Sequence, residues 1–195
     1  MRRNISKTCS TCLLALGLTL LPMASAFAAS FSVTSSTNLI TSGGTIEVDV
    51  KAQSVTDLAA YLFDLTYDPT KFQFVSGSAS EGTFLTTAGT TYFDGGDPSS
   101  PGLLQYVYDS LFGPGPGVSG DGLLVSFEFR ALDTGVAEFS LDPVSVTVLD
   151  SSGNIIEVGL QSADVTVPEP ATLCLLGLGL AGLASTRKRK MLMPS

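Results

Sequence analysis

The chain has 195 residues, no histidine, no tryptophan and only three cysteines. Between residues 30 and 167 it carries 17 acidic and three basic residues, a net charge of −14. Such a surface argues against nucleic acid as a partner, because phosphate binding needs clustered Lys and Arg. Cys9, Cys12 and Cys174 all lie outside this middle segment. The segment therefore has no disulfide, no thiolate nucleophile and no Cys/His zinc site.

Residues 1–28 have the three parts of a secretory signal peptide. The basic part consists of Arg2, Arg3 and Lys7, and the apolar run covers residues 13–21. The small residues of the cleavage site are Ala26 and Ala28. The apolar run is too short to span a bilayer comfortably. We therefore predict export and cleavage after Ala28, with residues 24–26 as a competing site.

From Ser30 onward, apolar and polar residues alternate with a period of two, which places alternate side chains on opposite faces of a strand. We expect strands at residues 45–51, 59–67, 72–74, 103–110, 125–130, 137–141, 144–148, 155–156 and 164–167. No segment has a helical period. Residues 94–102 and 113–122 are too rich in Gly and Pro for strands, and are expected to be irregular loops. Because many strands have one apolar and one polar face, we favour an antiparallel sandwich over a small barrel.

Four stretches of this segment together resemble a cohesin domain. They are residues 42–48 (Ser-Gly-Gly-Thr-Ile-Glu-Val), 61–74, 120–129 and 148–155. The resemblance implies an all-β, cohesin-like jelly-roll β-sandwich of about nine strands over residues 29–167, related to cellulose-binding modules. It also implies that the domain binds a dockerin-like protein or a polysaccharide and has no catalytic activity.

The C-terminal residues combine a proline-rich entry, an apolar run and a basic cluster. These parts are Pro168, Glu169 and Pro170, then residues 171–186, then Arg187, Lys188, Arg189 and Lys190. As a helix the run would span about 24 Å at 1.5 Å per residue, short of the roughly 30 Å hydrocarbon core. This marginal length suits a temporary membrane anchor, with a permanent anchor as the alternative. The positive-inside rule places both basic ends in the cytoplasm and the acidic segment outside.

Residues 168–190 closely resemble the PEP-CTERM sorting signal, carried here by Val-Pro-Glu-Pro-Ala-Thr at 167–172, the apolar run and the basic cluster. The resemblance implies a Gram-negative cell that makes extracellular polysaccharide. It further implies recognition and cleavage by an exosortase, a transpeptidase-like membrane enzyme. We therefore expect passage through the inner membrane, transient anchoring there, and then placement on the cell surface or secretion.

Metal binding and catalysis find little support in the residues. Asp94, Asp97 and Asp121 offer oxygen ligands for calcium, but Asp-Gly is ordinary turn chemistry and no Asp-x-Asp-x-Asp-Gly loop is present. We predict no metal site and no cofactor, and leave calcium as an alternative. Without histidine or a nucleophile motif, we also predict that the protein is not an enzyme.

The candidate ligand face is the outward side of the strand at residues 59–67, with Ala60, Leu62, Asp64 and Thr66. Tyr92, Tyr106 and Tyr108, the tyrosines that do not fall on the inward alternation, are further candidates. An apolar Leu62 favours an apolar helix of a partner over a sugar. We therefore predict an exported, non-catalytic surface or matrix protein that binds a protein partner or a polysaccharide. The alternatives are a structural matrix component without a specific ligand and, less favoured, a glycan-active enzyme.

Overall fold

The computed structural model describes residues 29–169. The expected signal peptide with Ala26 and Ala28, residue Pro170, the apolar run 171–186 and the basic cluster 187–190 lie outside the described residues. The elements are β1 (Ser30–Ser35), β2 (Thr45–Thr66), β3 (Phe72–Phe74), β4 (Ser80–Glu81), α1 (Thr83–Thr86), β5 (Thr91–Asp94), β6 (Asp97–Ser100), β7 (Leu103–Leu111), β8 (Val118–Ala131), β9 (Gly135–Leu141), β10 (Thr147–Asp150), β11 (Gly159–Gln161) and β12 (Ala163–Val167).

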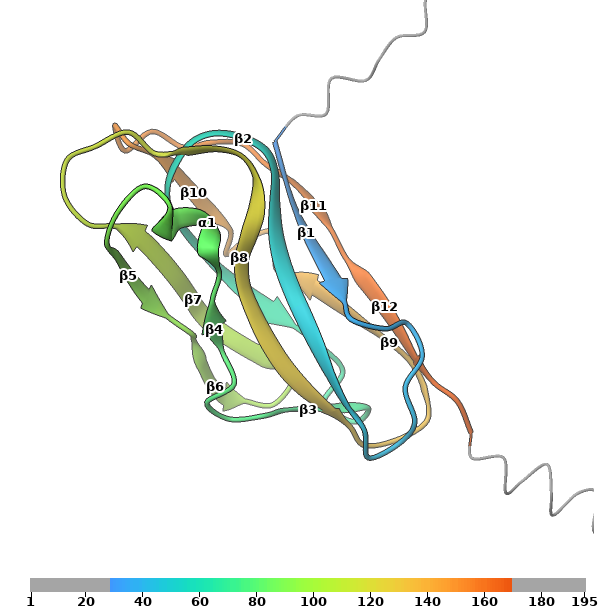
Figure 1. Cartoon of the computed structure of the whole chain (residues 1–195). Coiled ribbons are helices and arrows are strands. Elements are labelled where there is room, and N and C mark those ends of the chain that lie inside the picture. The colour runs from blue at the N-terminus through green and yellow to red at the C-terminus, as the bar shows by residue number, and fades with distance from the viewer. Residues whose placement is uncertain (1–28, 170–195) are drawn as a thin grey trace, which may run out of the picture.

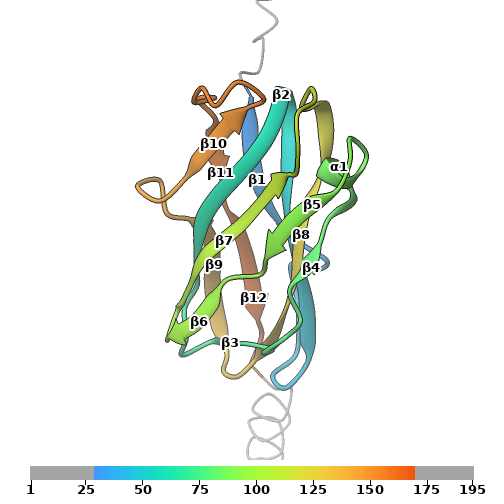
Figure 2. The same cartoon turned by 90° about the vertical axis from the view of Figure 1, so that its left-hand side faces the viewer.

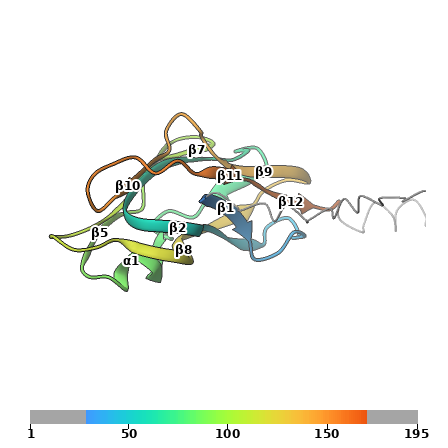
Figure 3. The ribbon, with the colours of Figure 1, turned by 90° about the horizontal axis from the view of Figure 1, so that it is seen from above.

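Two β-layers pack face to face, and β2 belongs to both (Figure 3). In one layer the first half of β2 lies between β1 and β8, which in turn pairs with the edge strands β3 and β4. In the other layer the second half of β2 lies between β10 and β7, and β5 and β6 pair with β7. β9 pairs with β12 and with the end of β2. This arrangement confirms the expected all-β jelly-roll sandwich.

The core follows the alternation seen in the sequence. In β2, Ile46, Val48 and Val50 point inward, and so do Tyr61, Phe63 and Leu65. Phenylalanines from the two layers meet between them: the rings of Phe129 and Phe139 lie 4.8 Å apart at their centroids, edge to face, a favourable geometry for aromatic pairs. This apolar interior stabilises the sandwich without disulfides.

β2 is one strand of 22 residues, where the sequence predicts two strands joined by a loop. It crosses between the layers at Ser54 and Asp57, whose φ angles are 52° and 58°. Such left-handed residues turn the chain sharply. Pairing with β8 continues through the turn, because Asp121 accepts a hydrogen bond from the Ser54 amide at 2.6 Å and Ser119 accepts one from the Asp57 amide at 2.9 Å.

Four further local expectations are wrong. Residues 155–156 form no strand, because Ile155 makes only an isolated bridge with Leu149. The segment 94–102 contains the edge strand β6, which tolerates Pro98 because an edge strand needs hydrogen bonds on one side only. β8 begins at Val118, inside the expected loop 113–122, because it pairs with the turn of β2. Val144, expected to begin the strand at residues 144–148, is 91% exposed. Its amide donates to the Asp142 carboxylate in a turn, and β10 starts only at Thr147.

The chain enters and leaves the described sandwich at opposite ends. β1 begins at one end and β12 finishes at the other (Figures 1 and 2). Within residues 29–169 no helix is long and apolar enough to cross a membrane, and the only helix there is the single turn α1.

Candidate functional site

The candidate surface is the outer face of the sheet β10–β2–β7–β5, which faces the viewer in Figure 2. Strand register places its side chains in two rows across four strands. One row is Thr147, Leu62, Tyr108 and Asp94, and the other is Leu149, Ala60, Ser110 and Tyr92. We call these eight residues, with Asp64 and Tyr106, the Leu62 face.

The centre of the Leu62 face is apolar and slightly hollowed. Ala60, Leu62 and Leu149 line a depression of about 210 Å³, together with Tyr61, Tyr108 and Thr147. The Tyr92 ring lies 6.2 Å from the Tyr108 ring and 62% of Tyr92 is exposed. An open apolar patch between polar borders is typical of a surface that another protein covers.

A β-bulge shapes one side of this face. Tyr106 has a φ of 59°, and between Phe63 and Leu65 the register of β2 against β7 shifts by one residue. The Asp64 carboxylate accepts a hydrogen bond from the Tyr106 amide at 2.8 Å. This bond stabilises the bulge, which leaves Tyr106 62% exposed.

The residues chosen from the sequence do not all contribute in the same way. Leu62 and Tyr108 line the hollow, and Tyr92 lies beside it. The Asp64 carboxylate binds the backbone of the bulge. The Thr66 hydroxyl lies 3.0 Å from the backbone oxygen of Ser140 in β9 and 2.8 Å from the Ser140 Oγ, so it is already hydrogen-bonded. Sequence reasoning missed Leu149 and Thr147, although Leu149 is a large apolar residue on the polar side of its strand.

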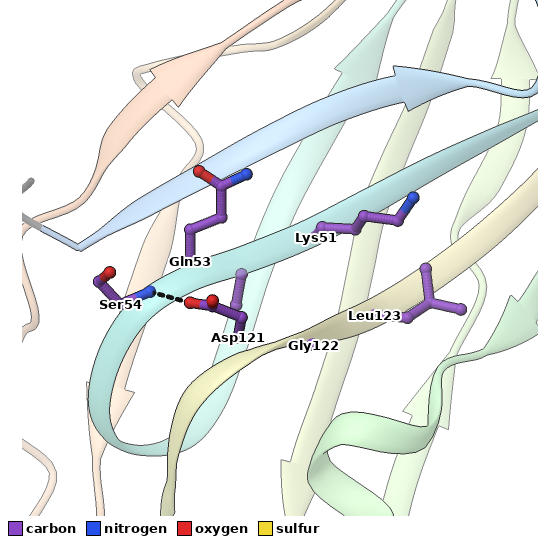
Figure 4. A pocket seen from close by; sticks show the side chains of 7 residues that line it. Lys51, Gln53, Ser54, Asp121, Gly122 and Leu123 are labelled. Atoms are coloured by element: carbon purple, nitrogen blue, oxygen red, sulfur yellow. Dashed lines mark hydrogen bonds between the residues drawn. The ribbon is translucent and has the colours of Figure 1, made fainter.

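A larger depression of about 470 Å³ lies on the other layer, between Lys51, Gln53 and Leu123 (Figure 4). Its polar groups already have partners. Lys51 Nζ lies 3.0 Å from the Asp49 carboxylate and donates to Thr34 Oγ1 at 3.1 Å, and Gln53 donates to Ser32 Oγ at 3.3 Å. With so many polar groups satisfied internally, this depression offers a ligand less than the Leu62 face does.

The carboxylates considered for calcium are engaged in turns. Asp94 accepts from the Gly96 amide at 3.0 Å, Asp97 from the Ser99 amide at 2.9 Å, and Asp121 from the Ser54 amide. Among residues 29–169 no three acidic, His or Cys side chains converge as a metal site would need.

Two family models match this chain. The model of the cohesin domain matches residues 29–167. The chain belongs to the cohesin family. A second model, that of the PEP-CTERM protein-sorting motif, matches residues 166–190. A comparison with curated proteins gives no match.

Solved cohesins share the fold at low identity. A type II cohesin in a cohesin–X-dockerin complex from Acetivibrio cellulolyticus is 19% identical and has a TM-score of 0.58, over 72% of this chain and 99% of that one. A non-cellulosomal cohesin from the archaeon Archaeoglobus fulgidus is 16% identical, with a TM-score of 0.58 over 73% and 92%. A cohesin module of a family 33 glycoside hydrolase from Clostridium perfringens is 14% identical, with a TM-score of 0.58 over 74% and 99%.

Asp57 clamps one border of the Leu62 face in this cohesin domain. Its carboxylate accepts from Ser151 Oγ, just after β10, at 2.7 Å, and from the Gly117 amide, just before β8, at 2.6 Å. These two hydrogen bonds hold the pKa of Asp57 below its usual value. The clamp fixes β10, and thereby Leu149, against the turn of β2.

An unpaired acid lies directly beneath the same sheet. Asp109 of β7 points inward, is 1% exposed, and neither of its carboxylate oxygens has a hydrogen-bond partner within the described chain. Burial, followed by the charge of Glu81, raises its pKa to about 7. Glu81 itself accepts a short hydrogen bond from the Thr91 hydroxyl of β5, which connects β4 to the other layer.

Proposed function

We propose that this protein is an exported docking protein, whose cohesin domain binds a dockerin-like protein partner through the Leu62 face. The observation that carries the proposal is the apolar hollow around Leu62, Tyr108 and Leu149, open to solvent on a strongly acidic domain. A partner helix with an apolar ridge fits such a hollow, and basic residues beside the ridge would complement acids such as Asp94. Dockerins in complex with solved cohesins agree with this class of partner.

A protein partner suits the Leu62 face better than a polysaccharide does. Sugar-binding surfaces usually present flat aromatic platforms, but the Tyr92 and Tyr108 rings are tilted by 56° to each other. Leu62 and Leu149 offer no hydrogen bonds to hydroxyl groups. We propose that the domain is not catalytic, because the Leu62 face brings together no acid–base pair and no nucleophile beside a base.

The binding test compares one residue on each outer surface. Leu62→Asp places a charge in the hollow, whereas Gln53→Asp places the same charge on the opposite sheet, where Gln53 is exposed. We expect Leu62→Asp to abolish capture of a dockerin-like protein from the same envelope, and Gln53→Asp to retain it. Equal capture by both variants would contradict the assignment of the face, and binding of polysaccharide alone would contradict the choice of partner.

We further propose that the tail is a sorting signal, processed by an exosortase after transient insertion in the inner membrane of a Gram-negative bacterium. The PEP-CTERM match supports this, together with the marginal length of the run 171–186. Replacing Arg187, Lys188, Arg189 and Lys190 by neutral residues should impair retention and processing, because these cations hold the end of the tail in the cytoplasm. If the variant with neutral residues at these four positions is processed and placed on the surface like the natural protein, the proposed role of the cations is wrong.

A further inference from the structure

The end of the sandwich from which the tail departs differs from the rest of its surface. We call it the exit end: the loop 36–44, the turn 68–71, the segment 130–136 from the end of β8 to the start of β9, and the last residues of β12. Backbone contacts tie these segments together. The Gly43 amide donates to Ala131 at 2.8 Å, the Leu132 amide to Lys71 at 2.7 Å, and the Ile40 amide to Thr166 at 3.1 Å.

Three large apolar residues are exposed at the exit end: Leu39 (62%), Leu132 (44%) and Val136 (63%). Leu39 and Val136 flank Thr166 on its two sides, because Leu39 forms a bridge with Thr166 and Val136 pairs with it. They lie immediately before the point where the chain leaves β12. Exposed apolar side chains in a row next to the tail lose contact with water when an apolar surface covers them, so this position favours contact with such a surface.

The charge of the exit end also departs from that of the domain. Lys71 and Arg130, two of the three basic residues between positions 30 and 167, lie here. Asp68 and Asp133 are the acids of the same segments, with Asp133 3.8 Å from Lys71, and the exposed Glu169 follows two residues after β12. With two cations and three acids the exit end carries a net charge of −1, against −14 for residues 30–167, so an anionic lipid surface repels it far less than it repels the remaining surface.

The chain leaves very little slack between the fold and the expected membrane run. Val167 is 1% exposed and paired with Gly135, so the fold holds the chain up to that residue. From Val167 to Ala171 the chain reaches about 14 Å at most, at about 3.3–3.6 Å per residue. The polar headgroup layer itself is roughly 5–8 Å thick on each side. The exit end therefore lies at the lipid headgroups while the tail is in place.

We infer that the exit end is a membrane-contact surface, on which the sandwich stands upright with Leu39, Leu132 and Val136 against anionic phospholipid. This inference rests on the proposed membrane insertion of the tail. Because the strands run from one end of the domain to the other (Figure 2), the Leu62 face then stands roughly perpendicular to the membrane and stays free for its partner. The start of β1 lies at the far end, so upright contact requires prior removal of the signal peptide.

The chain has no tryptophan, so one introduced tryptophan reports its own surroundings. Leu132→Trp places it at the exit end. Phe112→Trp places it at the far end, because Phe112 is 80% exposed and directly follows β7, whose Ser110 pairs with Ala60 close to the turn of β2 where β1 begins. Each variant is exported in a host without the sorting enzyme, so that the tail stays intact. It is then reconstituted in vesicles of phosphatidylethanolamine and phosphatidylglycerol that carry bromine near the headgroup.

We expect lipid bromine to quench most of the emission at position 132 and none at position 112. Leu39→Trp should be quenched like Leu132→Trp, which guards against a folding defect in one variant. If the protein floats with vesicles but positions 39 and 132 are not quenched, the membrane contact is wrong and the anchoring tail stands. If the protein fails to float, tail insertion is wrong and the contact falls with it. Equal quenching at position 112 would also overturn the upright arrangement.

Discussion

The two outer surfaces of the sandwich differ in whether their side chains already have partners within the domain. On the sheet formed by β1, β2 and β8, Asp49, Lys51 and Gln53 are bound to each other or to β1, and Ser126 Oγ donates to Asp49 at 2.5 Å. We call these residues the Lys51 face. On the Leu62 face, apolar side chains surround a hollow and have no covering layer. A surface whose polar groups are already paired gains little from a partner, whereas an uncovered apolar hollow gains by burial.

The largest expected effect is a change in the free energy of unfolding, and it comes from the different surroundings of the acids near the two faces. Asp49 has a cation and a hydroxyl as partners, whereas Asp109 has neither and has a pKa raised to about 7. An unfolded Asp ionises near pH 3.9, so the folded protein binds the extra proton and loses stability as the pH rises from about 4 to 7. Asp109→Asn should therefore raise the free energy of unfolding by about 2–4 kcal/mol near pH 8, with little change near pH 4.

Urea unfolding of the purified protein at both pH values measures this effect. Asp49→Asn is the matched control, and it should lower stability slightly near pH 8, because it weakens the contact with Lys51. A stability gain for Asp109→Asn that is equal at both pH values would contradict the buried, unpaired state of Asp109.

Two tyrosines on the Leu62 face should differ in their effects on binding. Tyr108 lines the hollow, whereas Tyr92 lies on β5, the edge strand of this sheet, and is mostly exposed. Truncation of a central aromatic residue costs about 2 kcal/mol of binding free energy, or about 30-fold in Kd, and a rim residue about 1 kcal/mol or less. We expect Tyr108→Ala to weaken partner binding more than Tyr92→Ala, as measured by titration calorimetry. The reverse order would place the centre of the interface nearer β5.

The smallest expected effect on stability and on partner affinity comes from a substitution on the Lys51 face. Lys51→Met removes an ion pair whose side chains are partly exposed, so stability should fall by less than about 1 kcal/mol. Partner affinity should not change, because Lys51 lies on the opposite layer. Thermal unfolding and the same calorimetric titration measure the two quantities. A marked loss of affinity would indicate that the partner also contacts this layer.

The sequence predicted the parts of this fold that depend on local alternation. The inward Tyr61, Phe63 and Leu65 and the outward Leu62 follow from a period of two. The continuity of β2 could not be read in this way, because the left-handed Ser54 and Asp57 are held by Asp121 and Ser119, more than sixty residues away. Leu149 joins the site only through the register of β10 on β2, which no local pattern specifies.

Site-specific photo-cross-linking tests the central claim most directly. A photoreactive amino acid replaces Leu62 in one variant and Gln53 in another, and both are expressed in the cell that makes the partner. We predict that position 62 cross-links to one discrete dockerin-like protein, through the helix that fills the hollow, and that position 53 gives no such product. Cross-linking from position 53 with none from position 62 would contradict the assignment of the Leu62 face as the docking surface.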